Sequence, residues 1–187
     1  MFNLRYAADY LLHRLKSKTR HGTHSPFVYR LVDKVIYDFY PKKVYADIEN
    51  SNNNIDKKTE RLIYRLVADW QPENIIKLGR GEGNLSAYLH KAAPHAKVYN
   101  IENSPGRVDC MVINDSADVY KDFELCLPKA HERTMLIVID IYKHKANKQA
   151  WTQIKAEPSV TVTIDLFFIG LVYFRKGQVK EDFLIKL

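Results

Sequence analysis

Apolar residues in the first seventy positions recur at the spacing of helices. Apolar residues three or four positions apart lie on one face of a helix, which then packs against a core. The sequence before Thr19 therefore predicts an amphipathic helix whose buried stripe consists of Leu4, Ala8, Leu11, Leu12 and Leu15. Its predicted solvated side carries Arg5, Arg14, Lys16 and Lys18.

Two more helices are predicted before residue 71. Ser25 followed by Pro26 indicates a helix start, because a serine hydroxyl caps the first turn and proline suits the first helical position. This helix runs to about Phe39, with the stripe Val28, Leu31, Val32, Val35 and Phe39. The polar run 49–54 predicts a loop, and a third helix spans 56–70. We divide the chain into an N-terminal helical extension, residues 1–54, and a domain of residues 55–187.

Beyond residue 73 the apolar residues gather in short runs typical of buried strands. Helical patterns at about 84–89, 118–130 and 145–156 separate several of them. Strands that alternate with helices predict an α/β fold with a mostly parallel sheet. The predicted strands are 75–78, 97–102, 109–114, 135–140, 160–166 and 171–174, the last two forming a hairpin that contains Gly170.

Length and composition narrow the class of protein. The 187 residues suit one domain with a helical extension, and 46% apolar residues is usual for a globular chain. No apolar run reaches the roughly 18 residues of a membrane span, and the N-terminus lacks the pattern of a secretory signal. We expect a cytoplasmic protein with no membrane partner. Cys110 and Cys126 lie in apolar runs without metal-binding spacing, which predicts buried thiols.

Positive charge is concentrated at the N-terminus. The net charge is +7, and residues 1–45, with nine Lys and Arg against three Asp, carry +6 of it. Nine of the 22 aromatic residues lie in the same segment. A basic, aromatic segment favours an anionic partner such as RNA. The alternative is that these charges are only the solvated side of the first helix.

A glycine-rich loop follows the first predicted strand and precedes a helix. It contains Gly79, Gly81 and Gly83. Backbone without side chains lets a nucleotide-like ligand approach a strand end, and a helix N-terminus favours its anionic part. Glu102 ends the second strand 21 residues after Gly81, where an acid accepts the hydroxyls of a ribose. A purely structural glycine turn is the alternative. Asn84 replaces the third glycine of GxGxxG, which disfavours a nicotinamide dehydrogenase.

Two segments resemble a known family. Residues 21–32 (HGTHSPFVYRLV) and 161–175 (TVTIDLFFIGLVYFR) resemble small bacterial class I S-adenosylmethionine-dependent, O-methyltransferase-like proteins. The resemblance implies a seven-stranded Rossmann-like sheet with an N-terminal helical extension. It also implies S-adenosylmethionine bound over the glycine loop, with Glu102 on the ribose.

The same resemblance suggests further site residues. It matches Asn114 and Asp115, after the family's fourth strand, to positions that hold a divalent cation in related enzymes, and here we expect these two residues to bind the cofactor. Asp140, Tyr142 and His144, after its fifth strand, are the candidate catalytic residues. His144 suits a general base because histidine titrates near neutrality. A solvated loop without a catalytic role is the alternative.

Three departures from the family pattern weaken the expected cofactor and metal sites. Lys77 stands where the family has an acid, and its cation would repel a sulfonium. Ile139 and Asp140 replace a pair of acids, so hard oxygen donors are too few and we expect no metal. Glu82 adds negative charge where the cofactor carboxylate would lie.

The chain is also short in the middle. Six residues separate Glu102 from Asp109, whereas a parallel crossover needs a dozen or more. We therefore expect a Rossmann-like sheet that lacks the third strand and its flanking helices. Strand 108–113 is parallel by family resemblance, but the turn-like residues 103–107 would make it a hairpin partner of 97–102. The uncovered edge strand predicts a homodimer.

Three functions stay open at this point. The first is a methyltransferase that acts on a small-molecule or RNA acceptor. The second is a non-catalytic binding or structural homologue that kept the fold and lost the pocket. The third is a nucleic-acid-associated module that uses the basic N-terminal helices.

Overall fold

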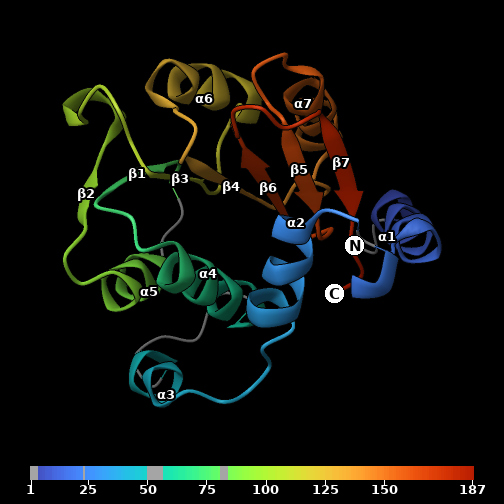
Figure 1. The fold of residues 1–187 in the computed structure, drawn as a ribbon, viewed down its shortest axis with the longest axis horizontal. Coiled ribbons are helices and arrows are strands. Elements are labelled where there is room, and N and C mark those ends of the chain that lie inside the picture. The colour runs from blue at the N-terminus through green and yellow to red at the C-terminus, as the bar shows by residue number, and fades with distance from the viewer. Residues whose placement is uncertain (1–3, 23, 50–56, 81–83) are drawn as a thin grey trace.

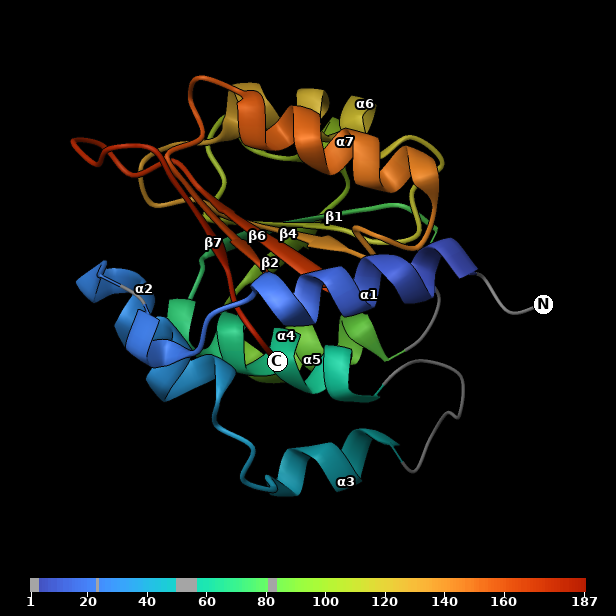
Figure 2. The ribbon, with the colours of Figure 1, turned by 90° about the vertical axis from the view of Figure 1, so that its right-hand side faces the viewer.

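The computed structural model describes residues 4–22, 24–49, 57–80 and 84–187. A seven-stranded sheet lies between two layers of helices (Figures 1 and 2). The helices are α1 (Leu4–Lys16), α2 (Pro26–Leu31), α3 (Lys43–Glu49), α4 (Lys57–Trp70), α5 (Leu85–Ala92), α6 (Val119–Cys126) and α7 (Lys145–Ala156). Helices α6 and α7 cover one face, and α2, α4 and α5 cover the other, with α3 outside them (Figure 2).

The strands are β1 (Asn74–Leu78), β2 (Lys97–Tyr99), β3 (Cys110–Ile113), β4 (Met135–Ile139), β5 (Val162–Asp165), β6 (Ile169–Tyr173) and β7 (Glu181–Leu184). Their order in the sheet is β2-β1-β3-β4-β6-β5-β7. The first four strands are mutually parallel, β6 is antiparallel to β4 and β5, and β7 is parallel to β5. The predicted α/β fold with a mostly parallel sheet is confirmed.

The direction of the strand near residue 110 is settled by its neighbours. β3 lies between β1 and β4 and is parallel to both, with Ile76 opposite Met111 and Met111 opposite Leu136. β2 pairs with the other side of β1, so the hairpin alternative is wrong. Within the described residues no strand lies beyond β2, which is an edge of the sheet.

An irregular connection carries the chain from β2 to β3. The short helix η3 (Ile101–Asn103) follows β2, and Lys129 then holds the chain by donating to the carbonyls of Ser104 and Pro105, both at 3.3 Å. Val108 donates to the carbonyl of Lys129 at 3.0 Å. The connection from β2 to β3 therefore contains no α-helix. Lys129, at the end of η4 (Leu127–Lys129), supplies hydrogen bonds to backbone groups that an α-helix would satisfy within itself.

Two apolar cores lie on the two faces of the sheet. One includes Val28, Leu66 and Ile75, so the N-terminal helix α2 packs in the same core as α4 and β1. The other includes Phe123 of α6 and Trp151 of α7. Cys110 and Cys126 are buried free thiols, as predicted. Burial raises the pKa of the Cys126 thiol to about 12 and raises the pKa of Cys110 as well.

The second helix starts as predicted but ends early. Ser25 caps α2, accepting a hydrogen bond from the Val28 amide, and Pro26 is the first helical residue. α2 then continues as the π-helix η2 (Val32–Ile36). Its wider turn, closed by the Tyr37 amide on the Val32 carbonyl, changes the phase of the helix before it ends. Phe39, predicted in the buried stripe, lies beyond the end of η2 and is 68% exposed.

Helix α1 has the opposite orientation to the predicted one. Asp9 and His13 are its buried residues. Leu4, Leu11, Leu12 and Leu15 are instead 76%, 61%, 52% and 82% exposed. Helix α1 lies beside the strands β5 to β7, separate from the main helical layers (Figure 1). The prediction failed because a polar face can be buried when every polar group meets a partner.

The hairpin near the C-terminus is shifted from the predicted bounds. The turn consists of Leu166 to Phe168, and Gly170 lies inside β6 opposite Val138. A Cβ on Gly170 would lie 2.6 Å from the Trp151 ring, so the glycine lets α7 approach the sheet. Strand β7 escaped the sequence analysis because Glu181 and Asp182 are exposed at the sheet edge. In the described ranges, no helix is both long and apolar enough to cross a membrane.

Replacing Gly170 by alanine tests this packing. The added methyl group would overlap the Trp151 ring, and overpacking of a core typically destabilises by about 1–3 kcal/mol. Gly106→Ala is the control, because a Cβ there has nothing within 4 Å. We expect urea unfolding to show a loss of stability for Gly170→Ala alone. Equal midpoints for the two variants would show that α7 does not depend on this contact.

Candidate functional site

The carboxyl ends of β1 and β3 form the point where the strand order reverses. The chain leaves β1 toward β2 on one side and later enters β3 on the other. In open parallel sheets, ligands bind outside the strand ends at such a point, because the connections diverge and leave a crevice. Gly79, Asn114 and Asp115 all follow these two strands.

Gly79 joins the two strand ends closely. Its φ of +90° favours glycine, and a Cβ there would lie 1.7 Å from the carbonyl oxygen of Asn114. The Asn114 amide donates to the backbone carbonyl of Leu78 at 3.0 Å, and the Arg80 amide donates to the backbone carbonyl of Asp115 at 3.3 Å. Asp115 itself has a φ of +50°. The structure therefore brings Gly79, Asn114 and Asp115 together. A side chain at position 79 would clash with the Asn114 backbone, so the packing of the two strand ends alone requires glycine there.

The remaining loop glycines, Gly81 and Gly83, lie outside the described residues, as does Glu82. Glu102 lies in η3, directly after β2, and its side chain is exposed. Since β2 is parallel to β1, with Ile76 opposite Tyr99, Glu102 follows its strand at the same edge of the sheet as Gly79.

Lys77 points its charge toward the helix after the glycine loop. Its ammonium group donates to the hydroxyl of Ser86, in the first turn of α5, at 3.2 Å. The side chain is half-buried. Lys77 thus places a cation near the end of β1.

Asp140 ends β4 in a tight turn. Its φ is +59°, and its amide donates to the carbonyl of Phe168 at 2.7 Å. Its carboxylate accepts from Lys143 at 2.9 Å. Hydrogen bonding to this carboxylate raises the pKa of Lys143, and the charge of Asp115 raises it further. Lys143 therefore pairs with Asp140 and feels the charge of Asp115, which follows β3.

Tyr142 is turned away from Asp140. Its hydroxyl donates to the carboxylate of Asp165 at 2.8 Å, and its ring stacks on Phe167 with centroids 4.8 Å apart. Burial and the Asp165 carboxylate raise the pKa of Tyr142. A phenolate is disfavoured there, so this hydroxyl suits a structural role better than that of a base.

Asp165 is the centre of a polar cluster that the sequence analysis missed. The residue is 3% exposed, and besides Tyr142 its side chain accepts from the Trp151 indole at 2.9 Å and the Phe167 amide at 3.0 Å. His13 Nε2 lies 3.1 Å from the Asp165 carboxylate and 3.3 Å from its carbonyl, so Nε2 carries the hydrogen. The sequence signal for this cluster was Asp165 itself, an acid inside the apolar run 160–174, because a buried carboxylate needs hydrogen-bond partners.

A second part of the cluster fixes α1. Asp9 accepts from Arg5 at 2.9 Å and from Lys148 of α7 at 2.6 Å. Arg5 also donates to the carbonyls of Tyr142 and Lys143, at 3.0 and 2.8 Å. Arg5, predicted to be solvated, is thus part of the contact between α1 and the loop after β4.

His144 is the third catalytic candidate. It precedes α7 and its side chain is exposed. Within the described part of the chain, no hydrogen bond or ion pair engages its imidazole. Of the three candidates, His144 has the side chain least committed to the fold. Nowhere in residues 4–22, 24–49, 57–80 and 84–187 do three His, Cys, Asp or Glu side chains gather as a metal-ligand set.

Comparisons with known proteins identify the fold. No family model and no curated protein matches the chain. Solved structures do match. A putative caffeoyl-CoA O-methyltransferase from Staphylococcus aureus has a TM-score of 0.56 at 14% identity, over 92% of this chain and 100% of that one. The O-methyltransferase TomG from Streptomyces achromogenes, in complex with SAM, gives 0.53 at 12%, over 79% and 95%.

A third match is the O-methyltransferase from Bacillus cereus in complex with SAH. Its TM-score is 0.52 at 13% identity, over 74% of this chain and 94% of that one. The fold is that of the class I O-methyltransferases. In this O-methyltransferase-like chain, the expected resemblance and the Rossmann-like fold are both confirmed.

In the O-methyltransferase-like fold, the loop after β4 connects the polar cluster to the carboxyl edge of the sheet. Residues 140–144 begin at the Asp140 turn and end at His144, with Tyr142 anchored on Asp165 between them. Anchoring the middle of a short loop restricts both of its ends. Tyr142 is therefore best described as a residue that positions its neighbours.

Replacing Tyr142 by phenylalanine tests the anchor. The variant leaves Asp165 with one donor fewer, and a hydrogen bond to a charged group contributes about 1.5–3 kcal/mol. Tyr120→Phe is a matched control, because within the described residues the Tyr120 hydroxyl makes no hydrogen bond. We expect a lower urea midpoint for Tyr142→Phe only. Unchanged stability in both variants would exclude a structural role for this hydroxyl.

Proposed function

We propose that this methyltransferase-like protein binds S-adenosylmethionine at the carboxyl ends of β1, β2 and β3. The observation that carries the proposal is the reversal of strand order beside Gly79, an exposed residue without a side chain. Glu102 follows β2 at the same edge, where its exposed carboxylate would accept the ribose hydroxyls. Solved structures of the same fold include complexes with SAM and with SAH.

The residues present fit such a ligand in part. Gly79, Asn114 and Asp115 leave backbone groups at the crevice, and Glu102 supplies an acid. When bound, S-adenosylmethionine supplies an electrophilic methyl group. The protein would orient the acceptor and exclude water, and His144 would accept the acceptor's proton.

A non-catalytic binding protein is the alternative that specific contacts favour. Lys77 places a cation beside the crevice, the Asp140 carboxylate is paired with Lys143, and the Tyr142 hydroxyl is held by Asp165. These contacts would weaken cofactor binding, and they engage two of the three catalytic candidates within the fold. Lys16 and Lys18, exposed at the end of α1 and just after it, favour an RNA partner as a second alternative.

Lys77→Glu tests where the cofactor lies. Replacing a cation by an acid near the sulfonium should tighten binding of S-adenosylmethionine by about fivefold, since one or two charge contacts of this kind contribute roughly 1 kcal/mol. Calorimetry measures the affinity of both forms. Lys97→Glu is the control, because it makes the same charge change at the start of β2, the opposite end of the strands. A weaker affinity in Lys77→Glu would place the ligand elsewhere, and no binding by the native chain at millimolar ligand would reject the proposed function.

We also propose that the chain forms a homodimer through β2. The edge at β7 is partly covered, because Lys18 bridges to Ile185, whereas Val98 in β2 is 45% exposed. An uncovered edge strand offers unpaired backbone groups to a second copy. Val98→Lys should convert a dimer to a monomer in light scattering. Val179→Lys, at an 86% exposed position before β7, should leave the dimer intact. A native monomer at high concentration would refute this proposal.

A further inference from the structure

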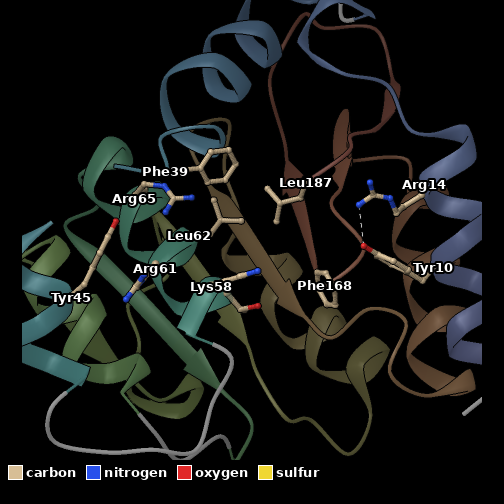
Figure 3. Close-up of a pocket in the computed structure, with 11 residues that line it drawn as sticks. Tyr10, Arg14, Phe39, Tyr45, Lys58, Arg61, Leu62, Arg65, Phe168 and Leu187 are labelled. Atoms are coloured by element: carbon tan, nitrogen blue, oxygen red, sulfur yellow. Dashed lines mark hydrogen bonds between the residues drawn. The ribbon is translucent and has the colours of Figure 1, made fainter. Parts of the chain in front are cut away.

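A hollow of about 620 Å³ lies between α1 and α4, and its described lining includes none of Gly79, Glu102 and Asp115. Figure 3 shows it bounded by α1 on one side and α4 on the other, with Phe168 and Leu187 between them. Its volume is within the range of about 300–1,000 Å³ typical of sites for small organic ligands. Neither the sequence patterns nor the proposed function gives it a role.

The walls of the hollow are strongly basic. Four cationic side chains line it: Arg14, Lys58, Arg61 and Arg65. None of the described lining residues is acidic. Helix α4 contributes three of these cations, two of them (Lys58 and Arg61) from its first two turns, where the positive end of the helix dipole also lies. The hollow therefore attracts negative charge.

The charge of Arg65 is buried without a carboxylate bonded to it in the described structure. Arg65 is 8% exposed and donates to the carbonyls of Val35 and Ile36, at 2.8 and 3.2 Å. Asp38, whose pKa the Arg65 charge helps to lower, is itself paired with Lys42 at 2.8 Å. Arg14 donates to the Tyr10 hydroxyl at 3.1 Å. Neutral oxygens hold both guanidinium groups, so their charge is available to an anion.

Aromatic and apolar groups form the rest of the wall. Tyr10 and Phe168 lie on the α1 side, with ring centroids 6.2 Å apart, and Leu62 lies on the α4 side. Phe39, which follows the end of η2, is exposed at the hollow. Such walls favour the flat face of an aromatic molecule.

The hydroxyl group of Tyr45, a residue that lines the hollow, lacks a hydrogen-bond partner in the described structure, although the residue is only 4% exposed. In Figure 3 the hydroxyl end of Tyr45 is directed toward Arg65. Buried polar groups almost always have a partner, so this hydroxyl is a candidate contact for a group bound in the hollow.

We propose that this hollow binds an aromatic anion, a flat organic molecule that bears a carboxylate or phosphate group. The ring lies between Phe168 and Leu62, and the anionic group lies among Arg14, Lys58 and Arg65. The Tyr45 hydroxyl completes the hydrogen bonds to the ligand. This site stands apart from the proposed function, because neither S-adenosylmethionine nor methyl transfer enters into it.

Fluorescence titration of the full chain with naphthalene probes tests the proposal. We expect 2-naphthoate or 2-naphthyl phosphate to bind, and their relative affinity distinguishes a carboxylate ligand from a phosphate ligand. The neutral 2-naphthalenemethanol should bind about tenfold more weakly, because it lacks the charge. Inorganic phosphate, which lacks the ring, should compete only at much higher concentration. No binding of either anion at millimolar concentration, or equal binding of the neutral probe, would overturn the proposal.

Variants locate the bound probe. Arg14→Gln should weaken naphthoate binding by about tenfold, and Arg133→Gln, a basic residue outside the hollow, should leave it unchanged. Leu11→Gln excludes binding on the exposed leucines of α1 and should also have no effect.

Tyr45→Phe should weaken binding without lowering the urea midpoint, since the hydroxyl has no protein partner in the described residues. An equal loss in Arg14→Gln and Arg133→Gln would mean general electrostatic attraction and would refute the site.

Discussion

The Asp165 carboxylate is the constraint on which the arrangement of this protein depends. A carboxylate that is 3% exposed is stable only if donors surround it. Its donors come from parts of the chain that are far apart: His13 of α1, Tyr142 of the loop after β4, and Trp151 of α7. One buried acid therefore fixes the position of two helices and a loop against the tip of the β5–β6 hairpin.

The same constraint explains the local geometry around it. Phe167 has a φ of +71°, which is unfavourable for a bulky residue, and its amide is held by Asp165. Its ring is enclosed by Tyr6, Tyr10, His13 and Tyr142. Hydrogen bonds and ring contacts thus stabilise a turn that the backbone alone would disfavour. Phe168, next in the chain, is carried into the wall of the hollow between α1 and α4.

The orientation of α1 follows from this polar cluster. Asp9 and His13 are satisfied by Arg5, Lys148 and Asp165, so the polar side of the helix is the buried one. The leucines are left outside. An apolar stripe indicates which face of a helix could be buried. The contacts offered by the surface on which the helix packs decide which face is buried. Here those contacts are ion pairs, hydrogen bonds and ring contacts with Phe167, and no local sequence pattern reveals them.

Much of the fold was accessible from the sequence. The Ser25 cap, the helix ending at Trp70 and the apolar strands were predicted because their signals are local: a hydroxyl before proline, or a run of branched residues. The site was accessible only in part. The family resemblance placed Gly79, Asn114 and Asp115 at the cofactor, and the parallel pairing of β1 and β3 brings them together. The engagement of Tyr142 by Asp165 was not expected, because the two residues are 23 positions apart.

The amino-acid sequence by itself determined the class of fold, since the alternation of buried strands and helices has few compact solutions. It also determined the start of α2 and the turn at Gly79, since proline and glycine act on the backbone directly. Only the tertiary structure decided that β3 lies parallel between β1 and β4, that α1 buries its charges, and that four cations face one hollow. Each of these depends on pairs of groups distant in sequence, whose hydrogen bonds and charges exist only once the chain has folded.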